Sequence, residues 1–176
     1  MTEVDLGRPS RFSRRFLERE LELALSSALA FCHTQGIKSD YSEESLIAFE
    51  ALLPRNPEEY LRVVSNFDKF KYDGSYLSDW LVALGPGSYF GEVILRILGG
   101  RWKYPSRLRV FLSLYTSYSS PIFLNWFVIV GKQKVPVFEI ARQRMILGTE
   151  GESFTQIYRK ISKGKYARRP SRISHR

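Results

Sequence analysis

The hydrophobic period of this chain changes from that of a helix to that of a strand after the pair Gly99-Gly100. After the pair, residues 107–117 alternate between apolar and polar side chains, which is the period of a strand. Helices in one run followed by strands favour an α+β fold with an antiparallel sheet over a fold in which the two alternate. Before the pair, apolar residues follow the i, i+3, i+4, i+7, i+8 spacing of a helix, as seen at Phe90, Val93, Ile94, Ile97 and Leu98.

Three helices are expected near the N-terminus from their start and stop signals. The first covers about residues 13–35 and ends before Gly36. The second begins after Ser42, a candidate N-cap, and ends at Pro54. The third begins at Asn56-Pro57, because Asn is a favoured cap and Pro is favoured at the first helical position.

A fourth helical stretch is expected in two pieces, at residues 76–84 and 88–98, with Gly85-Pro86-Gly87 as a kink between them. Glycines just before a helix can also cradle a phosphate. No strand precedes these glycines, however, and no acidic residue follows at the distance of a ribose-binding carboxylate. We therefore favour a kink, with Gly91 allowing close packing, over a phosphate site.

The second half of the chain predicts a meander of three or four antiparallel strands. Residues 107–117 form one strand, and residues 122–130, which are apolar on both faces, form a central one. Gly131-Lys132-Gln133 is a hairpin connection to a short strand at residues 134–137. C-terminal helices complete the expected fold, at about residues 138–147 and 152–162.

The composition fits one packed domain, since 44% of the residues are hydrophobic and 14% are aromatic. We expect a loose N-terminus at 1–12, a domain at 13–162 and a flexible basic tail at 163–176. The one cysteine, Cys32, excludes an internal disulfide. No signal peptide or membrane-length apolar run is visible, so we expect a soluble, cytoplasmic protein.

The charge of the chain is divided between its halves. Residues 1–92 hold 10 Lys and Arg against 15 Asp and Glu, a net of −5, while residues 93–176 hold 17 against 3, a net of +14. A basic half of this kind predicts a polyanionic or acidic partner. The alternative is that the acidic helices pack around the basic strands and neutralise them internally.

Basic and aromatic side chains on the predicted strands, together with the tail, are the candidate contact residues. Cations beside aromatic rings on a sheet can hold phosphates and stack bases, and a cationic tail gives salt-sensitive binding. The alternative is that the strand aromatics pack beneath the C-terminal helices and the cations lie at a solvated edge. The candidates are Arg107, Arg109, Phe111, Tyr115, Lys132, Lys134, Lys163, Lys165, Arg168, Arg169 and Arg172.

No catalytic constellation is visible in the sequence. Cys32 and His33 are adjacent, so on a helix they project about 100° apart and cannot act as a nucleophile and its base. No cluster has metal-ligand spacing. Glu92 and Glu139 could pair as carboxylates only if the fold brought them together, and we favour an i, i+4 pair of Glu92 with Arg96 instead. We expect neither an enzyme nor a cofactor.

One segment resembles a group of small bacterial α+β domains of unknown function. In that group, a helix carrying Gly-Glu-Val/Ile ends at Gly-Gly-x-Trp and opens an antiparallel meander followed by helices. The similarity extends over about residues 45–161, and it implies the same fold and a partner-binding protein rather than an enzyme. The matching residues are Gly85, Tyr89, Gly91, Glu92, Gly99, Gly100 and Trp102.

The sequence therefore predicts a non-catalytic binding protein that uses a basic sheet face and a basic tail on RNA, on a ribonucleoprotein or on an acidic protein. A second hypothesis is a protein–protein adaptor or toxin-neutralising module. Its contact surface would be the acidic N-terminal helices, with Glu43, Glu44, Glu58 and Glu59. A third is a small hydrolase or nucleotide enzyme at residues 85–92.

Overall fold

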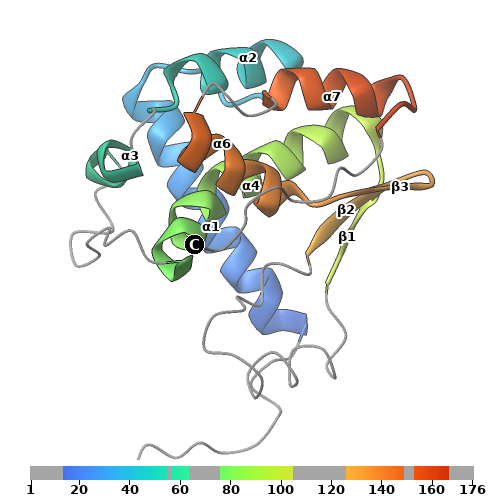
Figure 1. Cartoon of the computed structure of the whole chain (residues 1–176), viewed down its shortest axis with the longest axis horizontal. Coiled ribbons are helices and arrows are strands. Elements are labelled where there is room, and N and C mark those ends of the chain that lie inside the picture. The colour runs from blue at the N-terminus through green and yellow to red at the C-terminus, as the bar shows by residue number, and fades with distance from the viewer. Residues whose placement is uncertain (1–13, 55–56, 64–75, 105–125, 149–152, 167–176) are drawn as a thin grey trace, which may run out of the picture.

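The computed structural model describes residues 14–54, 57–63, 76–104, 126–148 and 153–166 (Figure 1). Helices come first, a small antiparallel sheet follows, and two helices close the chain, which confirms the predicted α+β fold. None of the described helices has the length and apolar character needed to span a membrane. The elements are α1 (Arg14–Thr34), α2 (Glu43–Leu52), α3 (Pro57–Val63), α4 (Tyr76–Leu98), β1 (Arg101–Lys103), β2 (Phe127–Val130), β3 (Gln133–Val135), α6 (Val137–Leu147) and α7 (Phe154–Ser162).

Helix α4 lies at the centre of the molecule, with the other helices and the sheet around it (Figure 1). Its Tyr89 and Phe90 side chains are completely buried. The Tyr89 ring packs on Phe49 of α2 with centroids 4.5 Å apart, and the Phe90 ring stacks on Phe154 of α7 at 4.8 Å. Aromatic rings bury the largest areas of any side chains, so these contacts anchor α2 and α7 to the core.

The predicted division into helical pieces at 76–84 and 88–98 is wrong, because α4 continues as one helix through Gly85-Pro86-Gly87 from Tyr76 to Leu98. A proline inside a helix costs about 3 kcal/mol in isolation. Here the surrounding residues 82–91 are buried or nearly so, and tertiary packing of this kind overrides local propensity.

The three glycines of α4 are packing positions. A Cβ on Gly85 would overlap the Tyr60 hydroxyl, and one on Gly87 would lie 2.6 Å from the Phe138 ring. A Cβ on Gly91 would overlap the Trp102 indole. The predicted close packing at Gly91 is therefore confirmed, and the missing side chains let α3, α6 and β1 approach the same helix.

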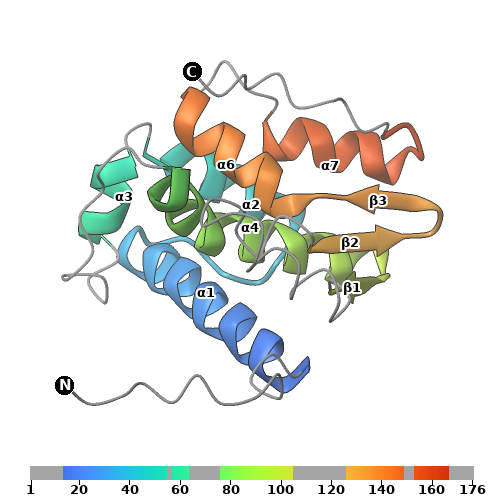
Figure 2. The same ribbon diagram turned by 60° about the horizontal axis from the view of Figure 1, so that its bottom comes forward.

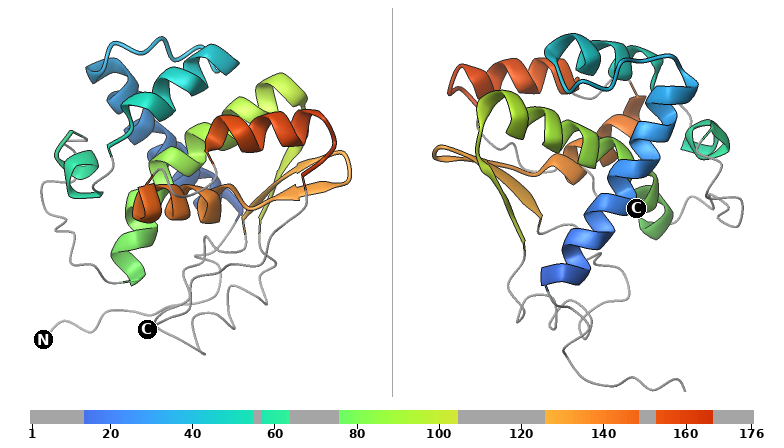
Figure 3. Two further views of the ribbon diagram at one scale, coloured as in Figure 1. Left: turned by 45° about the horizontal axis from the view of Figure 1, so that its top comes forward. Right: turned by 180° about the vertical axis from the view of Figure 1, so that it is seen from behind.

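Helices α2 and α7 lie side by side over one side of α4 (Figure 3). Each starts at a serine cap: Ser42 accepts a hydrogen bond from the Ser45 amide, and Ser153 accepts one from the Gln156 amide, both at 3.0 Å. The Ser42 cap was predicted and is confirmed. The cap satisfies a donor that would otherwise have no partner in the first turn of the helix.

The sheet has the order β1-β2-β3 with antiparallel neighbours, so the prediction that β2 is central is confirmed. The sequence did not predict β1. Gly99 and Gly100, with φ of 70° and 120°, turn the chain directly from α4 into this strand. Side chains are strained at such φ values, which is why glycines occupy both positions.

The remaining strand predictions are only partly covered by the described residues. The predicted strand at 107–117 and the first part of the one at 122–130 lie outside the described residues. The hairpin turn is confirmed, but β3 covers residues 133–135 rather than 134–137. The chain leaves the sheet early because α6 already begins at Val137, directly after Pro136.

Candidate anion-binding face

One face of the sheet is buried against the helices. Trp102, Val128 and Val135 form a cross-strand row on this face. The Trp102 indole stacks on Phe138 of α6 with centroids 5.9 Å apart, and its Nε1 donates to Glu92 Oε1 of α4 at 2.9 Å. The Trp102 ring therefore belongs to this inner face.

The opposite face carries cations. Arg101, Ile129 and Lys134 form a cross-strand row, and Lys103 lies opposite Phe127. The side chains of Arg101, Lys103 and Lys134 are exposed, and we call these three residues the basic face. None of the strand residues on this side is a carboxylate.

Phe127 lies beneath the basic face rather than on it. The Lys134 ammonium is 3.7 Å from the centroid of the Phe127 ring, which is 4% exposed. Such a cation–π contact contributes about 0.5–1 kcal/mol at an exposed site. It orients the Lys134 side chain across the sheet while leaving the residue exposed.

A second group of cations lies where the β2–β3 turn meets the end of α7 (Figure 2). Gln133 joins the two, because it donates to the Ile161 carbonyl at 2.9 Å and accepts from the Tyr166 amide at 3.1 Å. Lys132 in the turn and Lys163 and Lys165 after the helix are exposed. We call these three lysines the basic end.

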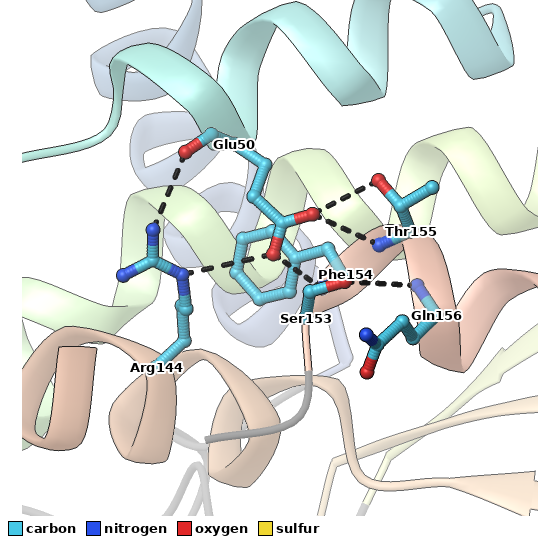
Figure 4. A network of polar contacts seen from close by, with 6 residues as sticks. All are labelled: Glu50, Arg144, Ser153, Phe154, Thr155 and Gln156. Atoms are coloured by element: carbon cyan, nitrogen blue, oxygen red, sulfur yellow. Dashed lines mark hydrogen bonds and ion pairs between the residues drawn. The ribbon is translucent and has the colours of Figure 1, made fainter. Parts of the chain in front are cut away.

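Part of the divided charge is neutralised internally, between α2 and the C-terminal helices (Figure 4). Arg144 Nε lies 3.6 Å from a carboxylate oxygen of Glu50; the Arg144 side chain is buried and that of Glu50 is largely buried. The same carboxylate accepts from the Phe154 amide at 2.7 Å and from the Thr155 amide at 3.1 Å, so it also caps α7. At the surface, Glu43 Oε1 and Arg159 Nε are 2.8 Å apart.

Five cations of the basic face and the basic end take no part in this internal pairing within the described residues. Within the described part of the chain, Arg101, Lys103, Lys132, Lys163 and Lys165 make no ion pair with a carboxylate. Among the described residues, the carboxylates of α2 therefore pair with arginines of α6 and α7 and not with these five cations.

The structure places only some of the predicted contact residues. Lys132, Lys134, Lys163 and Lys165 are exposed at the hairpin and after α7. Arg101 and Lys103 were missed, although the Arg-Trp-Lys alternation directly after Gly99-Gly100 is a strand signal. Seven predicted residues lie outside the described part of the chain, namely Arg107, Arg109, Phe111, Tyr115, Arg168, Arg169 and Arg172.

The tail predicted from residue 163 begins with ordered residues. Lys163 to Tyr166 hydrogen-bond to the last turn of α7 and to Gln133. Residues 167–176 lie outside the described part.

The glycine-rich segment offers no phosphate cradle. A cradle needs unpaired amides at a helix N-terminus, whereas α4 begins at Tyr76 and its glycines lie in its middle. Tyr60, Phe138 and Trp102 fill the space beside those glycines.

The carboxylates considered for catalysis are each engaged separately. Glu92 binds Trp102 and lies 3.7 Å from Arg96, which confirms the predicted i, i+4 pair. Glu139 accepts from Gln143 at 2.8 Å and pairs with Arg142 at 3.4 Å. Among the described residues, no three His, Cys, Asp or Glu side chains gather as metal ligands.

Cys32 is not suited to nucleophilic chemistry. Its side chain is completely buried, and this burial raises the pKa of the thiol to about 11. The reactive thiolate is therefore scarce at neutral pH.

The acidic N-terminal surface is partly used by the fold itself. Glu43 pairs with Arg159, and Glu58 lies 3.8 Å from Arg62 within α3. Glu44 and Glu59 are exposed. Only part of the predicted adaptor surface thus remains available.

A comparison with protein-family models, curated proteins and solved structures finds no match to this chain. The similarity to small bacterial α+β domains stays a prediction.

Proposed function

We propose that this protein is a non-catalytic binding protein whose basic face engages the phosphate backbone of RNA. The observation that carries the proposal is the exposed set of Arg101, Lys103 and Lys134 on one side of the sheet, with no carboxylate among the strand residues there.

The spacing of these cations suits a repeating anion. Residues two apart on a strand are separated by about 6.6 Å, and residues two strands apart by about 9.6 Å. The cations therefore cover a surface on which successive phosphates of one strand can each find a partner. Binding of this kind does not depend on sequence and weakens steeply with salt.

An acidic protein is a less suitable partner for this face. The centre of a protein–protein interface is rich in aromatic and other apolar contact surface. Phe127 lies beneath the basic face, buried under Lys134, and offers no such surface.

The proposal is tested by titrating the full chain with a labelled single-stranded RNA of about 20 nucleotides at several salt concentrations. The variant Arg101→Gln with Lys103→Gln should weaken binding about tenfold or more at low salt. It should also reduce the slope of log K against log salt by about 1.4, since each single-strand phosphate contact contributes about 0.7.

The matched control is Lys38→Gln with Arg62→Gln, which removes the same charge from exposed positions on the acidic side of the molecule. It should change the affinity less than twofold. Equal losses in the two variants would show that only net charge matters and would overturn the proposed site. Tighter binding of polyglutamate than of RNA would identify an acidic protein as the partner class instead.

A further inference from the structure

Tyr41, in the connection between α1 and α2, has a backbone conformation that side chains rarely adopt. Its φ is 59°, whereas the other described residues with positive φ are glycines. For a bulky residue this conformation is an outlier, and it persists only where surrounding contacts hold it. The contacts of the Tyr41 ring therefore indicate what the conformation serves.

The Tyr41 ring lies against two side chains of α4. It stacks on Tyr89 with ring centroids 5.5 Å apart, and the guanidinium carbon of Arg96 lies 3.8 Å from the centroid of the Tyr41 ring. Tyr89 and Arg96 are about two helical turns apart, so they lie on the same face of α4. Tyr89 is completely buried. The Tyr41 ring thus connects the core to a guanidinium at the surface.

The Arg96 guanidinium is held in place and is still exposed. Its Nε lies 3.7 Å from Glu92 Oε2, and its side chain is 57% exposed. The group is planar, and the Tyr41 ring covers one side of it. The exposed part is therefore the outer face of a flat cation.

Glu92 connects this guanidinium to the strand of the basic face. While Glu92 Oε2 faces Arg96, Oε1 accepts a hydrogen bond from the Trp102 indole at 2.9 Å. Trp102 lies between Arg101 and Lys103 on β1. The exposed guanidinium therefore lies beside the strand that carries two of the three basic-face cations. Neighbouring nucleotides of one RNA strand can reach both.

We propose that Arg96, supported by the Tyr41 ring, is a stacking site for one nucleobase of the RNA strand whose phosphates bind the basic face. This inference rests on the proposed function. Unpaired bases stack on guanidinium planes in the recognition of single-stranded RNA. Such stacking accepts any base, because every base has a π face. The substrate class is therefore single-stranded RNA, whose bases are free to turn outward.

The test compares two labelled strands of about 20 nucleotides, oligo(A) and an abasic strand with the same ribose-phosphate backbone. The full-length native protein should bind oligo(A) about fivefold more tightly or better, the gain expected from stacking one base. Arg96→Lys keeps the charge but loses the plane. It should lose most of this preference, while its affinity for the abasic strand stays within about twofold of the native value.

The matched control is Arg62→Lys on α3. Arg62 also pairs with a glutamate at i, i+4, since it lies 3.8 Å from Glu58, and its side chain is 80% exposed. This variant should keep the native preference for oligo(A). Tyr41→Leu removes the ring beneath Arg96 and should reduce the preference as Arg96→Lys does, whereas Tyr41→Phe keeps a ring there and should preserve it.

The outcomes separate the inference from the proposed function. Equal binding of the two strands by the native protein would overturn the stacking site while phosphate binding stands, and this comparison needs no variant to fold. An unchanged preference in Arg96→Lys, or equal losses on both strands, would also overturn it. If Arg101→Gln with Lys103→Gln leaves RNA binding unchanged, the proposed function fails, and the inference fails with it.

Discussion

At the scale of single residues, Gly91 shows how a missing side chain positions the sheet. It lies in the interior of α4, where glycine is less favourable than alanine by about 1 kcal/mol. The Trp102 indole occupies the place that a Cβ would take. The same indole donates to Glu92, so β1 is fixed to α4 by packing and by a hydrogen bond.

The substitution Gly91→Ala should therefore destabilise the protein by about 1–3 kcal/mol, the usual cost of overpacking a core. Urea denaturation measures the change. In a Trp102→Leu background, the same substitution should be neutral or stabilising, because the clash is gone and only helix propensity remains. Stabilisation by Gly91→Ala in the native protein would contradict this packing argument.

At the scale of elements, two ion pairs in different environments join α2 to the C-terminal helices: Glu50 pairs with Arg144 of α6, and Glu43 pairs with Arg159 of α7. The Glu50 and Arg144 side chains are only 12% and 7% exposed, whereas Arg159 in the pair with Glu43 is 57% exposed. Breaking a buried pair leaves an uncompensated charge, but an exposed charge is solvated by water. The Glu50–Arg144 pair should therefore contribute more to the stability of the fold than the Glu43–Arg159 pair, although its N–O distance is longer, 3.6 Å against 2.8 Å.

We expect Glu50→Ala to cost about 3–5 kcal/mol, since it also removes the carboxylate acceptor of the first amides of α7. The matched substitution Glu43→Ala should cost no more than about 1 kcal/mol. Thermal or urea unfolding measures both. Adding Arg144→Met to Glu50→Ala should restore part of the lost unfolding free energy. The second substitution removes the buried guanidinium that Glu50→Ala leaves without its carboxylate partner. Equal costs for the two single substitutions would show that burial does not set the strength of these contacts.

At the scale of the whole molecule, the boundary of the folded domain lies beyond the last helix. Residues 163–166 contribute the Schellman pattern, the bond to Gln133 and the packing of Tyr166. Residues 167–176 contain little that could be buried, and four arginines. The packed unit is therefore expected to end at Tyr166 rather than at residue 162.

A chain that ends after Tyr166 should keep the Tm of the full protein to within about 2 °C. A chain that ends after Ser162 should melt about 2–8 °C lower, because 1 kcal/mol corresponds to about 2–4 °C for a protein of this size. Differential scanning calorimetry of the two chains distinguishes them. If both melt like the full protein, residues 163–166 do not contribute to the fold.

The sequence by itself determined the α+β class, the Ser42 cap, the start of α3 at Pro57 and the central position of β2. These features depend on caps, turns and hydrophobic period, which involve residues within a few positions of one another. Lys132 and Lys134 were predicted as contact residues because the local hairpin pattern around Gly131 places them in the turn and on the strand after it.

Only the tertiary structure decided that α4 continues through Pro86, that β1 exists, and which arginines pair with the carboxylates of α2. The Glu50–Arg144 and Gln133–Tyr166 contacts join residues 94 and 33 positions apart. Such partners are chosen by how whole elements pack, and no local period or spacing specifies that choice.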